Sequence, residues 1–292
     1  MPSLPPFFEP YQRPIQAALN AFVPEPAEGG AGTPVVNAMR ATLLAPAKRV
    51  RAVLVLLSAD LCGGTATFAM PAACAVEAIH ASSLVLDDLP CMDDAELRRG
   101  QPAAHIQFGE AVAILAAFGL LNEAFGHLAR SYDAGLAQRI SATLSHAVGL
   151  DGLIAGQSED VLAAETTITF ETLERIHRRK TGVLFSAAAS AGALTAGATV
   201  DDISALTAYA KNLGLAFQIV DDMLDVIGTT AETGKVVRAD ARKTTFVSFS
   251  GVDGARALAG ELCETAKTAL TPFGRRAASL HALADFVAAR RG

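Results

Sequence analysis

Apolar residues fall in segments of helical length along most of the chain, and Gly and Pro separate these segments. Ala and Leu recur throughout and runs of β-branched residues are short, which favours helices over strands. A short N-terminal helix and a flexible connection from Pro24 to Pro34 are expected first, and the next apolar helix should end at Gly63-Gly64. We expect further helices at about 71–86, from the loop at 100–102 to about 130, at 137–163 with interruptions at 149–156, at 170–198, 200–227 and 254–270, and at the C-terminus.

This pattern indicates one folded unit. No internal repeat with a period of about 20–50 residues is visible, and no shift in composition marks a boundary. A transmembrane helix needs roughly 18 or more consecutive apolar residues. The closest candidates are 111–121, which stops at Asn122-Glu123, and 185–200, which is built from small residues and is expected at the centre of a bundle. The sequence predicts an all-α, single-domain protein over residues 1–292, with ten or more helices and no transmembrane segment.

Composition and charge exclude some classes of partner. The 292 residues are 51% hydrophobic and 18% charged, which is ample for a core. The net charge of −6 argues against a nucleic-acid binder, since that function needs a basic surface. The four cysteines show no C-x-x-C pairing, and the N-terminus lacks the basic head and apolar stretch of a secretion signal. We therefore expect reduced thiols in a cytoplasmic protein.

A cluster of carboxylates directly follows the apolar segment 71–86. Asp87 and Asp88 precede Pro90, Asp93 and Asp94 follow it, and nothing basic lies among them. Pro90 blocks the continuation of a regular helix. A bulge at this proline would bring Asp93 back beside Asp87 and Asp88.

A second carboxylate cluster lies more than 120 residues downstream, within an expected helix. Gln218, Asp221 or Asp222, and Asp225 recur every three or four residues and therefore share one helix face. Asp221 and Asp225 form an i, i+4 pair of like charge, which is mildly destabilising on a bare helix.

Two such clusters, each in a strongly apolar setting, favour a bound cation over solvated surface carboxylates, although a single Asp-Asp pair would more often be solvated. Buried carboxylates must be neutralised or paired. Ca²⁺ is a possible partner, but the D-x-D-x-D-G spacing of a calcium loop does not occur. Mg²⁺ fits better, because it takes one or two carboxylates, keeps waters and completes its shell with substrate phosphates. The sequence therefore predicts a phosphorylated substrate.

Basic residues placed beside both acidic clusters support a diphosphate. Metal would hold such a group on one side, and Lys or Arg on the other. Taken singly, each basic residue would more often be a solvated surface residue. The set comprises Lys48, Arg51, Arg98, Arg99, Lys180, Lys235 and Lys243.

From about Asn37 to Val252 the chain resembles the trans-isoprenyl diphosphate synthases, most closely the bacterial geranylgeranyl diphosphate synthases of the carotenoid type. Asp87-Asp-Leu-Pro-Cys-Met-Asp93 is similar to the longer, bacterial form of the first aspartate-rich motif of that family, and Asp221-Asp-Met-Leu-Asp225 to the second. Further matches are Pro71–His80, Leu97–Gly100, Gly156-Gln157, Lys180-Thr-Gly182, Phe217-Gln218, Gly234-Lys235 and Lys243-Thr-Thr245. The resemblance implies helices around a central cavity, and mostly homodimers.

The resemblance also implies a role for each matching residue. Two diphosphates would be bound, and three Mg²⁺ ions would surround the allylic one. Isopentenyl diphosphate would be held by Lys48, Arg51, His80 and Arg99. The metal ions would be bound by Asp87, Asp88, Asp93, Asp221, Asp222 and Asp225. The allylic diphosphate would contact Arg98, Lys180, Lys235 and Lys243, and the reacting allyl group would be positioned by Thr181 and Gln218.

Three positions depart from the common pattern of the family. Ala47 and Ala52 replace the Gly and Pro that flank the basic motif in many members, Leu86 stands where many have His, and the connection Asp240–Lys243 is shorter than usual. The last two departures resemble the carotenoid-type branch.

Product length is expected to depend on the fourth and fifth residues before Asp87, which are Ser83 and Ser82. In the family a bulky aromatic residue there stops growth at fifteen carbons, so two serines imply a geranylgeranyl product of twenty carbons. The alternative is that both serines only pack against another helix, and Phe118 or Phe125 could cap the channel instead.

The expected activity is Mg²⁺-dependent condensation of isopentenyl diphosphate with dimethylallyl, geranyl or farnesyl diphosphate. Three other functions are alternatives. A farnesyl diphosphate synthase differs only in product length. A terpene cyclase usually has an Asn/Ser/Glu second motif. A non-catalytic partner subunit of a prenyl synthase commonly has degraded aspartate motifs, whereas both are intact here.

Overall fold

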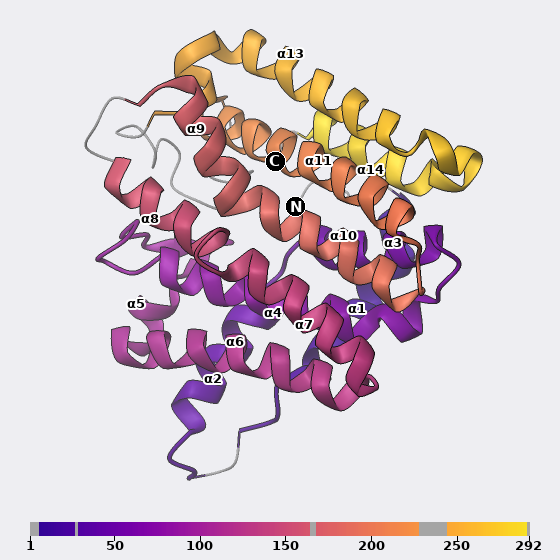
Figure 1. Cartoon of the computed structure of the whole chain (residues 1–292). Helices are drawn as coiled ribbons and strands as arrows, with labels where there is room; N and C mark the ends of the chain where they lie inside the picture. The colour runs from indigo at the N-terminus through magenta and orange to yellow at the C-terminus, as the bar shows by residue number, and fades with distance from the viewer. Residues whose placement is uncertain (1–5, 27–28, 164–167, 228–243, 291–292) are drawn as a thin grey trace.

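The structure, a computed structural model, describes residues 6–26, 29–163, 168–227 and 244–290. Helices account for nearly all of the regular structure (Figure 1). The elements are η1 (Pro6–Phe8), α1 (Glu9–Phe22), α2 (Thr33–Leu44), α3 (Val50–Leu61), α4 (Ala66–Asp87), β1 (Leu97–Arg98), β2 (Gln101–Pro102), α5 (Ala104–Phe108), α6 (Glu110–Ser131), α7 (Ala134–Val148), α8 (Leu153–Ala163), α9 (Phe170–His177), η2 (Arg178–Gly182), α10 (Val183–Thr195), α11 (Val200–Ile227), α13 (Phe246–Ala269), η3 (Thr271–Ala277) and α14 (Ala278–Ala289). The prediction of an all-α bundle is confirmed.

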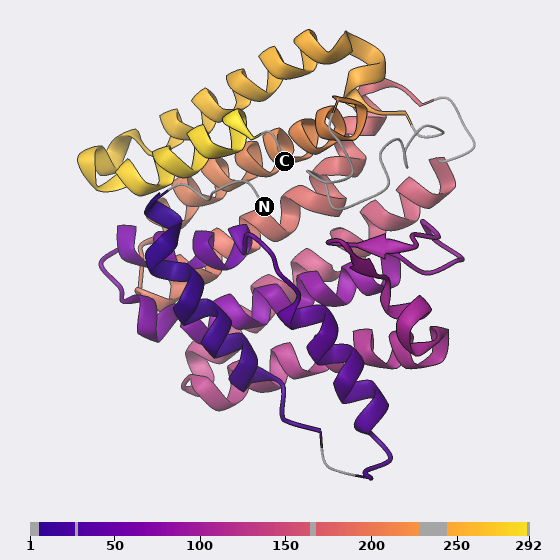
Figure 2. The same cartoon turned by 180° about the vertical axis from the view of Figure 1, so that it is seen from behind.

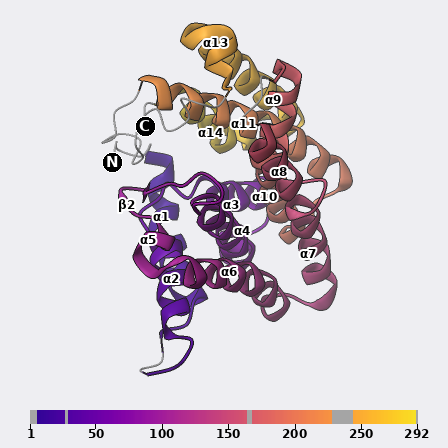
Figure 3. The ribbon, with the colours of Figure 1, turned by 90° about the vertical axis from the view of Figure 1, so that its left-hand side faces the viewer.

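Helices α3, α4 and α10 occupy the centre of the molecule. Figure 3 shows them enclosed by α1, α2 and α6 on one side, α7 and α8 on another, and α11, α13 and α14 above. Seen from behind, α1 and α2 lie side by side across the lower part of the bundle (Figure 2). The two helices that carry the aspartate clusters, α4 and α11, both pack against α10.

Small residues let α10 occupy this central position, as its composition predicts. Nearly all of its residues are buried. A Cβ atom on Gly192 would lie 2.1 Å from the carbonyl oxygen of Val55, so only glycine allows the backbones of α10 and α3 to approach this closely.

Helix α4 begins at Ala66, five residues before the predicted start at Pro71. Thr65 caps it by accepting a hydrogen bond from the Phe68 backbone N–H. Pro71 therefore lies in the second turn, where the break that it causes is bridged by Tyr132. The Tyr132 hydroxyl accepts from the Ala72 N–H at 3.2 Å and donates to the Phe68 carbonyl oxygen at 2.8 Å.

Two other helix boundaries differ from prediction for local reasons. The helix expected up to residue 130 is divided at Gly109, whose φ of 84° is incompatible with a continuous helix. Helix α13 includes an extra turn before the expected start at Gly254: it begins at Phe246, where Thr245 and Ser248 form a capping box, and it is kinked at Gly251, whose φ is 68°.

Helices α4 and α6 are long and apolar enough to cross a membrane by length and composition. The apolar window of α4 is 67% buried inside the bundle, as in a core helix, whereas that of α6 is only 33% buried. Helix α6 thus presents apolar side chains on the outside of the bundle.

Candidate functional site

The first aspartate cluster folds back on the end of α4. After Pro90, the Asp93 N–H donates to the Asp87 carbonyl oxygen at 2.9 Å, and the Ala95 N–H donates to that of Asp88 at 3.2 Å. The predicted return of Asp93 toward Asp87 and Asp88 is confirmed.

Within this cluster, Asp88 and Arg98 bind one another. The Nε atom of Arg98 lies 2.9 and 3.1 Å from the two carboxylate oxygens of Asp88, and Nη2 forms a third contact. The short β1–β2 hairpin, with Arg99 and Gly100 at positive φ, places this guanidinium against the buried Asp88. The sequence assigned these two residues to metal and diphosphate respectively. Their mutual ion pair stabilises the loop that carries Asp93.

Among the cations around Asp87, Lys180 has the largest effect on the pKa of its carboxyl group. Burial raises the pKa of Asp87, Lys180 opposes that rise and Asp93 adds to it. The Lys180 Nζ atom donates to Asp160 Oδ2 at 2.7 Å. Although burial lowers the pKa of Lys180, the carboxylates of Asp87, Asp160 and Asp93 outweigh that effect and raise it. Lys180 therefore stays protonated between two acidic groups.

Lys180 and Thr181 lie on η2, a π-helical turn between α9 and α10, within the segment 170–198 that was expected to be helical. A Cβ atom on Gly156 would lie 2.3 Å from the Lys180 backbone nitrogen, so glycine lets α8 approach this turn. Asp160, on the same helix, then reaches Lys180.

The second cluster is joined to this turn by hydrogen bonds. The Thr181 hydroxyl donates to Gln218 Oε1 at 3.0 Å, and Gln218 Nε2 donates to Asp222 Oδ1 at 3.0 Å. The other oxygen of Asp222 accepts from the Phe246 N–H at 3.1 Å. Asp222 is buried and anchors the start of α13, whereas Asp221 and Asp225 are more exposed on the same helix. The η2 turn thus connects both aspartate clusters, with Lys180 on one side and Thr181 on the other.

A group of basic residues surrounds the start of α3. Arg51 Nη1 lies 3.3 Å from His80 Nε2, and the guanidinium lies 4.6 Å from the centre of the Phe185 ring. Burial lowers the pKa of Arg51 to about 10 and that of Arg99 to about 10. Burial and the positive charge of Arg290 lower the pKa of Lys48 to about 8, although Asp221 opposes this shift.

His80 completes this basic group. Its pKa is lowered by burial and then by Arg51, Arg99 and Arg98. A neutral imidazole among several guanidinium groups can accept a hydrogen bond from Arg51 and still present a polar atom to an anion. Cations gathered in this way form a site for a negatively charged ligand.

Two residues that the sequence analysis did not single out position this group. Arg49 and Glu77 form an ion pair of 3.3 Å in which both side chains are buried. Glu77 Oε1 also accepts from the Ala52 N–H at 3.1 Å and so fixes the first turn of α3. A lone glutamate within the apolar stretch 71–80 was the available signal.

Arg290 was also missed, because a terminal arginine gives no pattern. Its Nη2 lies 2.9 Å from Asp221 Oδ1, and its guanidinium lies 4.2 Å from the centre of the Phe217 ring. The residue that follows α14 therefore reaches the second aspartate cluster.

Ser82 and Ser83 lie near the end of α4, as expected. The Ser82 hydroxyl donates to the Ala117 carbonyl oxygen of α6 at 2.8 Å, and the Ser83 hydroxyl donates to the His80 carbonyl oxygen at 2.9 Å. Ser82 therefore faces α6, and its role in product length stays a prediction. Lys235 and Lys243 lie outside the described residues.

The first cluster fits a metal ion that draws further ligands from outside the chain. In the part of the chain that the structure describes, no three Asp, Glu, His or Cys side chains form a complete metal site. Asp87 and Asp93 are adjacent, and the carboxylate of Asp93 adds to the rise that burial causes in the pKa of Asp87. Two carboxylates completed by water and phosphate suit Mg²⁺.

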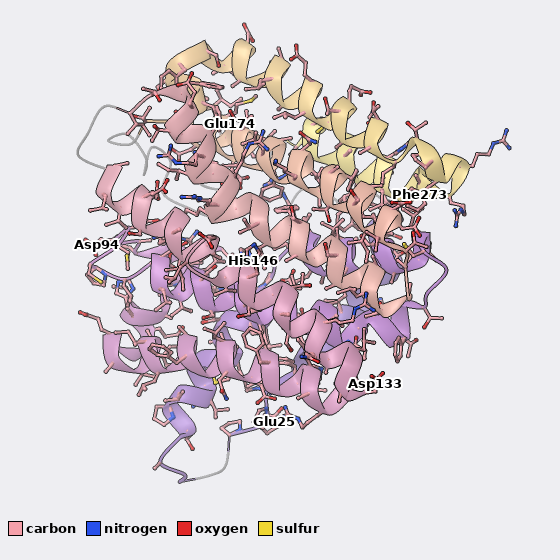
Figure 4. The ribbon with its side chains drawn as sticks, in the orientation of Figure 1. Glu25, Asp94, Asp133, His146, Glu174 and Phe273 are labelled. Carbon is pink, nitrogen blue, oxygen red and sulfur yellow. The ribbon has the colours of Figure 1, made fainter. Side chains whose placement is uncertain are left out.

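A groove of about 660 Å³ lies elsewhere, between α7 and the segment from α9 to α10. His146 and Glu174 line it on the front face in Figure 4, whereas Asp94 of the first aspartate cluster lies at the left edge. The groove shares Arg179 and Gly182 with the η2 turn, but it is not lined by Lys180 or Thr181.

Comparison with known proteins gives the same family as the motifs. The family model described as polyprenyl synthetase matches residues 33–259. The chain is 42% identical over 282 residues to a geranylgeranyl diphosphate synthase of Cyanophora paradoxa, covering 94% of this chain and 93% of that protein. Among solved structures, an FPP/GFPP synthase of Zymomonas mobilis has a TM-score of 0.85, 34% identity and 97% coverage of both chains.

A geranyltransferase of Helicobacter pylori, solved in complex with magnesium and isoprenyl diphosphate, also has a TM-score of 0.85. It is 26% identical to this chain, and the match covers 98% of this chain and 99% of that one. From the family match and these likenesses, the chain belongs to the polyprenyl synthetase family.

Proposed function

We propose that the protein is a geranylgeranyl diphosphate synthase, which condenses isopentenyl diphosphate with an allylic diphosphate. The observation that carries this proposal is the η2 turn, where Lys180 lies beside the first aspartate cluster and Thr181 is bonded through Gln218 to the second. The 42% identity to a geranylgeranyl diphosphate synthase supports it. All of residues 1–292 form one domain in this proposal, supported by a hydrophobic core that extends from Phe8 to Val287.

The allylic diphosphate binds between the two aspartate clusters. Three Mg²⁺ ions, when bound, supply positive charge that stabilises the diphosphate as it leaves. The ions would be held by Asp87, Asp88, Asp93, Asp221, Asp222 and Asp225. Of these, Asp88 also binds Arg98, and Asp222 also accepts a hydrogen bond from Gln218. Further positive charge comes from Arg98, Lys180, Lys235 and Lys243.

Isopentenyl diphosphate binds at the basic group around the start of α3. Lys48, Arg51, His80 and Arg99 hold its diphosphate, and this orients its double bond toward the allylic carbon. The Thr181 hydroxyl and the Gln218 amide position the allyl group, which loses diphosphate as the new carbon–carbon bond forms. A proton is then lost to the released diphosphate, which leaves a prenyl chain five carbons longer.

The product has twenty carbons in this proposal, because Ser82 and Ser83 are small. Farnesyl diphosphate synthesis is the alternative within the family. The chain is also proposed to be cytoplasmic and to serve carotenoid synthesis.

A homodimer is supported by the outer face of α6. Leu115, Phe118, Asn122 and Phe125 recur at intervals of three and four residues, and Phe118 is 62% exposed. This spacing forms a seam suited to a second helix. Two copies of one seam are self-complementary about a twofold axis.

The proposed function is tested by incubating purified protein with isopentenyl diphosphate and dimethylallyl, geranyl or farnesyl diphosphate, with and without Mg²⁺. Chromatography should identify geranylgeranyl diphosphate only when both substrates and Mg²⁺ are present. A product from geranyl diphosphate alone would indicate a terpene cyclase. Inactivity of the purified chain under every condition would favour a non-catalytic partner subunit.

A further inference from the structure

Arg290 occupies a position between the two proposed diphosphate sites. It follows the last residue of α14, and its side chain is only 9% exposed. The Nη2 atom pairs with Asp221 at 2.9 Å, and the guanidinium stacks on Phe217 at 4.2 Å. Asp221 is one of the residues proposed to hold Mg²⁺.

Most of the hydrogen-bonding capacity of this guanidinium is unused. The Nε and Nη1 atoms of Arg290 are buried and have no hydrogen-bond partner among the residues that the structure describes. A buried charged donor without an acceptor is unfavourable. These N–H groups are therefore suited to a ligand that brings several acceptor oxygens, as a diphosphate does.

The neighbours of Arg290 are the cations proposed to bind isopentenyl diphosphate. Arg51 lies 5.9 Å from the centre of the same Phe217 ring, and Lys48 lies 5.9 Å from that of Phe286, four residues before Arg290. The charge of Arg290 lowers the pKa of both Lys48 and Arg51, whereas that of Asp221 raises both. Asp221 thus faces three cations.

We propose that Arg290 exchanges partners during the reaction cycle. It neutralises Asp221 until a divalent ion takes that carboxylate, and it then donates its unused N–H groups to the diphosphate held by Lys48 and Arg51. A guanidinium and Mg²⁺ beside one carboxylate repel each other, while an anion beside Lys48 and Arg51 attracts the guanidinium. This inference rests on the proposed function.

The exchange couples the two sites. Arg290 and Mg²⁺ compete for Asp221, so Arg290 weakens metal binding in the absence of isopentenyl diphosphate. Metal binding releases Arg290 and so strengthens the binding of isopentenyl diphosphate, and linkage requires the reverse effect to be equal.

The substitution Arg290→Gln tests this exchange through two effects of opposite sign. Removing the competing cation should tighten the binding of Mg²⁺ alone about 3–10-fold, measured by calorimetry in the absence of any diphosphate. Removing the donor should raise the KM for isopentenyl diphosphate about 10–100-fold. Coupling between linked sites commonly changes an affinity by roughly 5–150-fold. The expected change in KM lies within this range, and the expected change in Mg²⁺ affinity lies at its lower end. Arg290→Lys keeps the positive charge, so its Mg²⁺ affinity should equal that of the wild type. Its KM for isopentenyl diphosphate should lie between the values of the wild type and of Arg290→Gln.

Arg256→Gln is the matched control, because Arg256 makes an exposed ion pair of 3.7 Å with Asp253 on α13. It should change neither quantity. Weaker or unchanged Mg²⁺ binding in Arg290→Gln, or an unchanged KM, would overturn the exchange, and thermal denaturation of each variant verifies folding. If the wild type itself made no prenyl product, the proposed function would fail, whereas the calorimetric comparison would still decide whether Arg290 competes with Mg²⁺.

Discussion

The Thr181 hydroxyl donates a hydrogen bond to Gln218 Oε1 at 3.0 Å and so ties the π-helical turn η2 to α11. Gln218 in turn holds Asp222. This part-buried side-chain contact therefore helps to set the position of the second aspartate cluster relative to Lys180.

Replacing Thr181 by Val should remove this contact and leave the partly buried Gln218 oxygen without its donor. Such a loss costs about 1–3 kcal/mol, so we expect kcat to fall about 10–100-fold. Steady-state assays with both substrates measure the effect. Thr143→Val is the control, since the Thr143 hydroxyl only bonds the Arg139 carbonyl oxygen within α7. An unchanged kcat in Thr181→Val would show that the contact does not position the site.

The buried pair of Arg49 and Glu77 should matter chiefly for stability. Glu77→Gln leaves the charge of Arg49 buried without a counter-ion and should lower the free energy of unfolding by about 3–5 kcal/mol. Urea denaturation measures this change. Asp253→Asn, at an exposed pair on α13, should cost less than about 1 kcal/mol. Equal losses in the two variants would contradict this view of Glu77.

Binding of isopentenyl diphosphate should weaken as the pH rises through about 8. The pKa of Lys48 is lowered to about 8 by burial and by Arg290, so its cation is present below this pH and lost above it. We expect kcat/KM for isopentenyl diphosphate to fall above pH 8, because this quantity reports ionisation in the free enzyme. Lys48→Arg should move the fall to higher pH. A pH profile identical to that of the wild type would exclude Lys48 as its origin.

The burial of Lys48 should also make the free energy of unfolding depend on pH. Between about pH 8 and the unperturbed value of 10.5, the unfolded chain binds more protons at this residue than the folded chain does. The Lys48 contribution to the free energy of unfolding should therefore rise with pH over this window. Denaturation of the wild type and Lys48→Met across this range measures the difference.

Replacing Phe118 by Glu should separate the proposed dimer. A charge in the centre of the apolar face of α6 makes burial against a second copy unfavourable. Light scattering after gel filtration should give the mass of a monomer for this variant and of a dimer for the wild type. Val200→Glu, at an exposed apolar residue that starts α11, should stay dimeric. A monomeric wild type would contradict the proposal.

Replacing Ser82 by Phe should shorten the product toward farnesyl diphosphate. The added ring would fill the space between α4 and the α6 backbone, where Ser82 now bonds Ala117. Product chromatography measures the ratio of fifteen- to twenty-carbon chains. An unchanged ratio would place the end of the channel elsewhere, and Phe125→Ala would then test the aromatic candidate that packs against the core.

The sequence predicted those features that depend on local rules. Helical spacing placed Asp221 and Asp225 on one face, Pro90 predicted the return of Asp93, and the small residues of 185–200 predicted the central helix. Contacts between distant segments could not be predicted in this way. The bridge from Tyr132 to the backbone around Pro71 joins positions about 60 residues apart, and a helix-breaking residue alone does not reveal what compensates for it.

In the candidate site too, local patterns were predicted and contacts between distant residues were not. Motifs identified the charged residues but not their partners, so Asp88 and Arg98 were assigned to ligands although they bind each other. Glu77 and Arg290 belong to no spacing pattern. Only the fold brings Glu77 to Arg49, and Arg290 to Asp221.

The hydroxyl of Tyr132 replaces one backbone hydrogen bond of α4, and this has a consequence for the far end of that helix. A long rod transmits a small change of angle near its base as a larger displacement at its tip. Tyr132 lies at the corner between α6 and α7, so the direction in which α4 delivers Asp87 is set in part from the opposite end of the bundle. Sequence changes at that corner would alter the geometry of the reaction centre without touching any charged group in it.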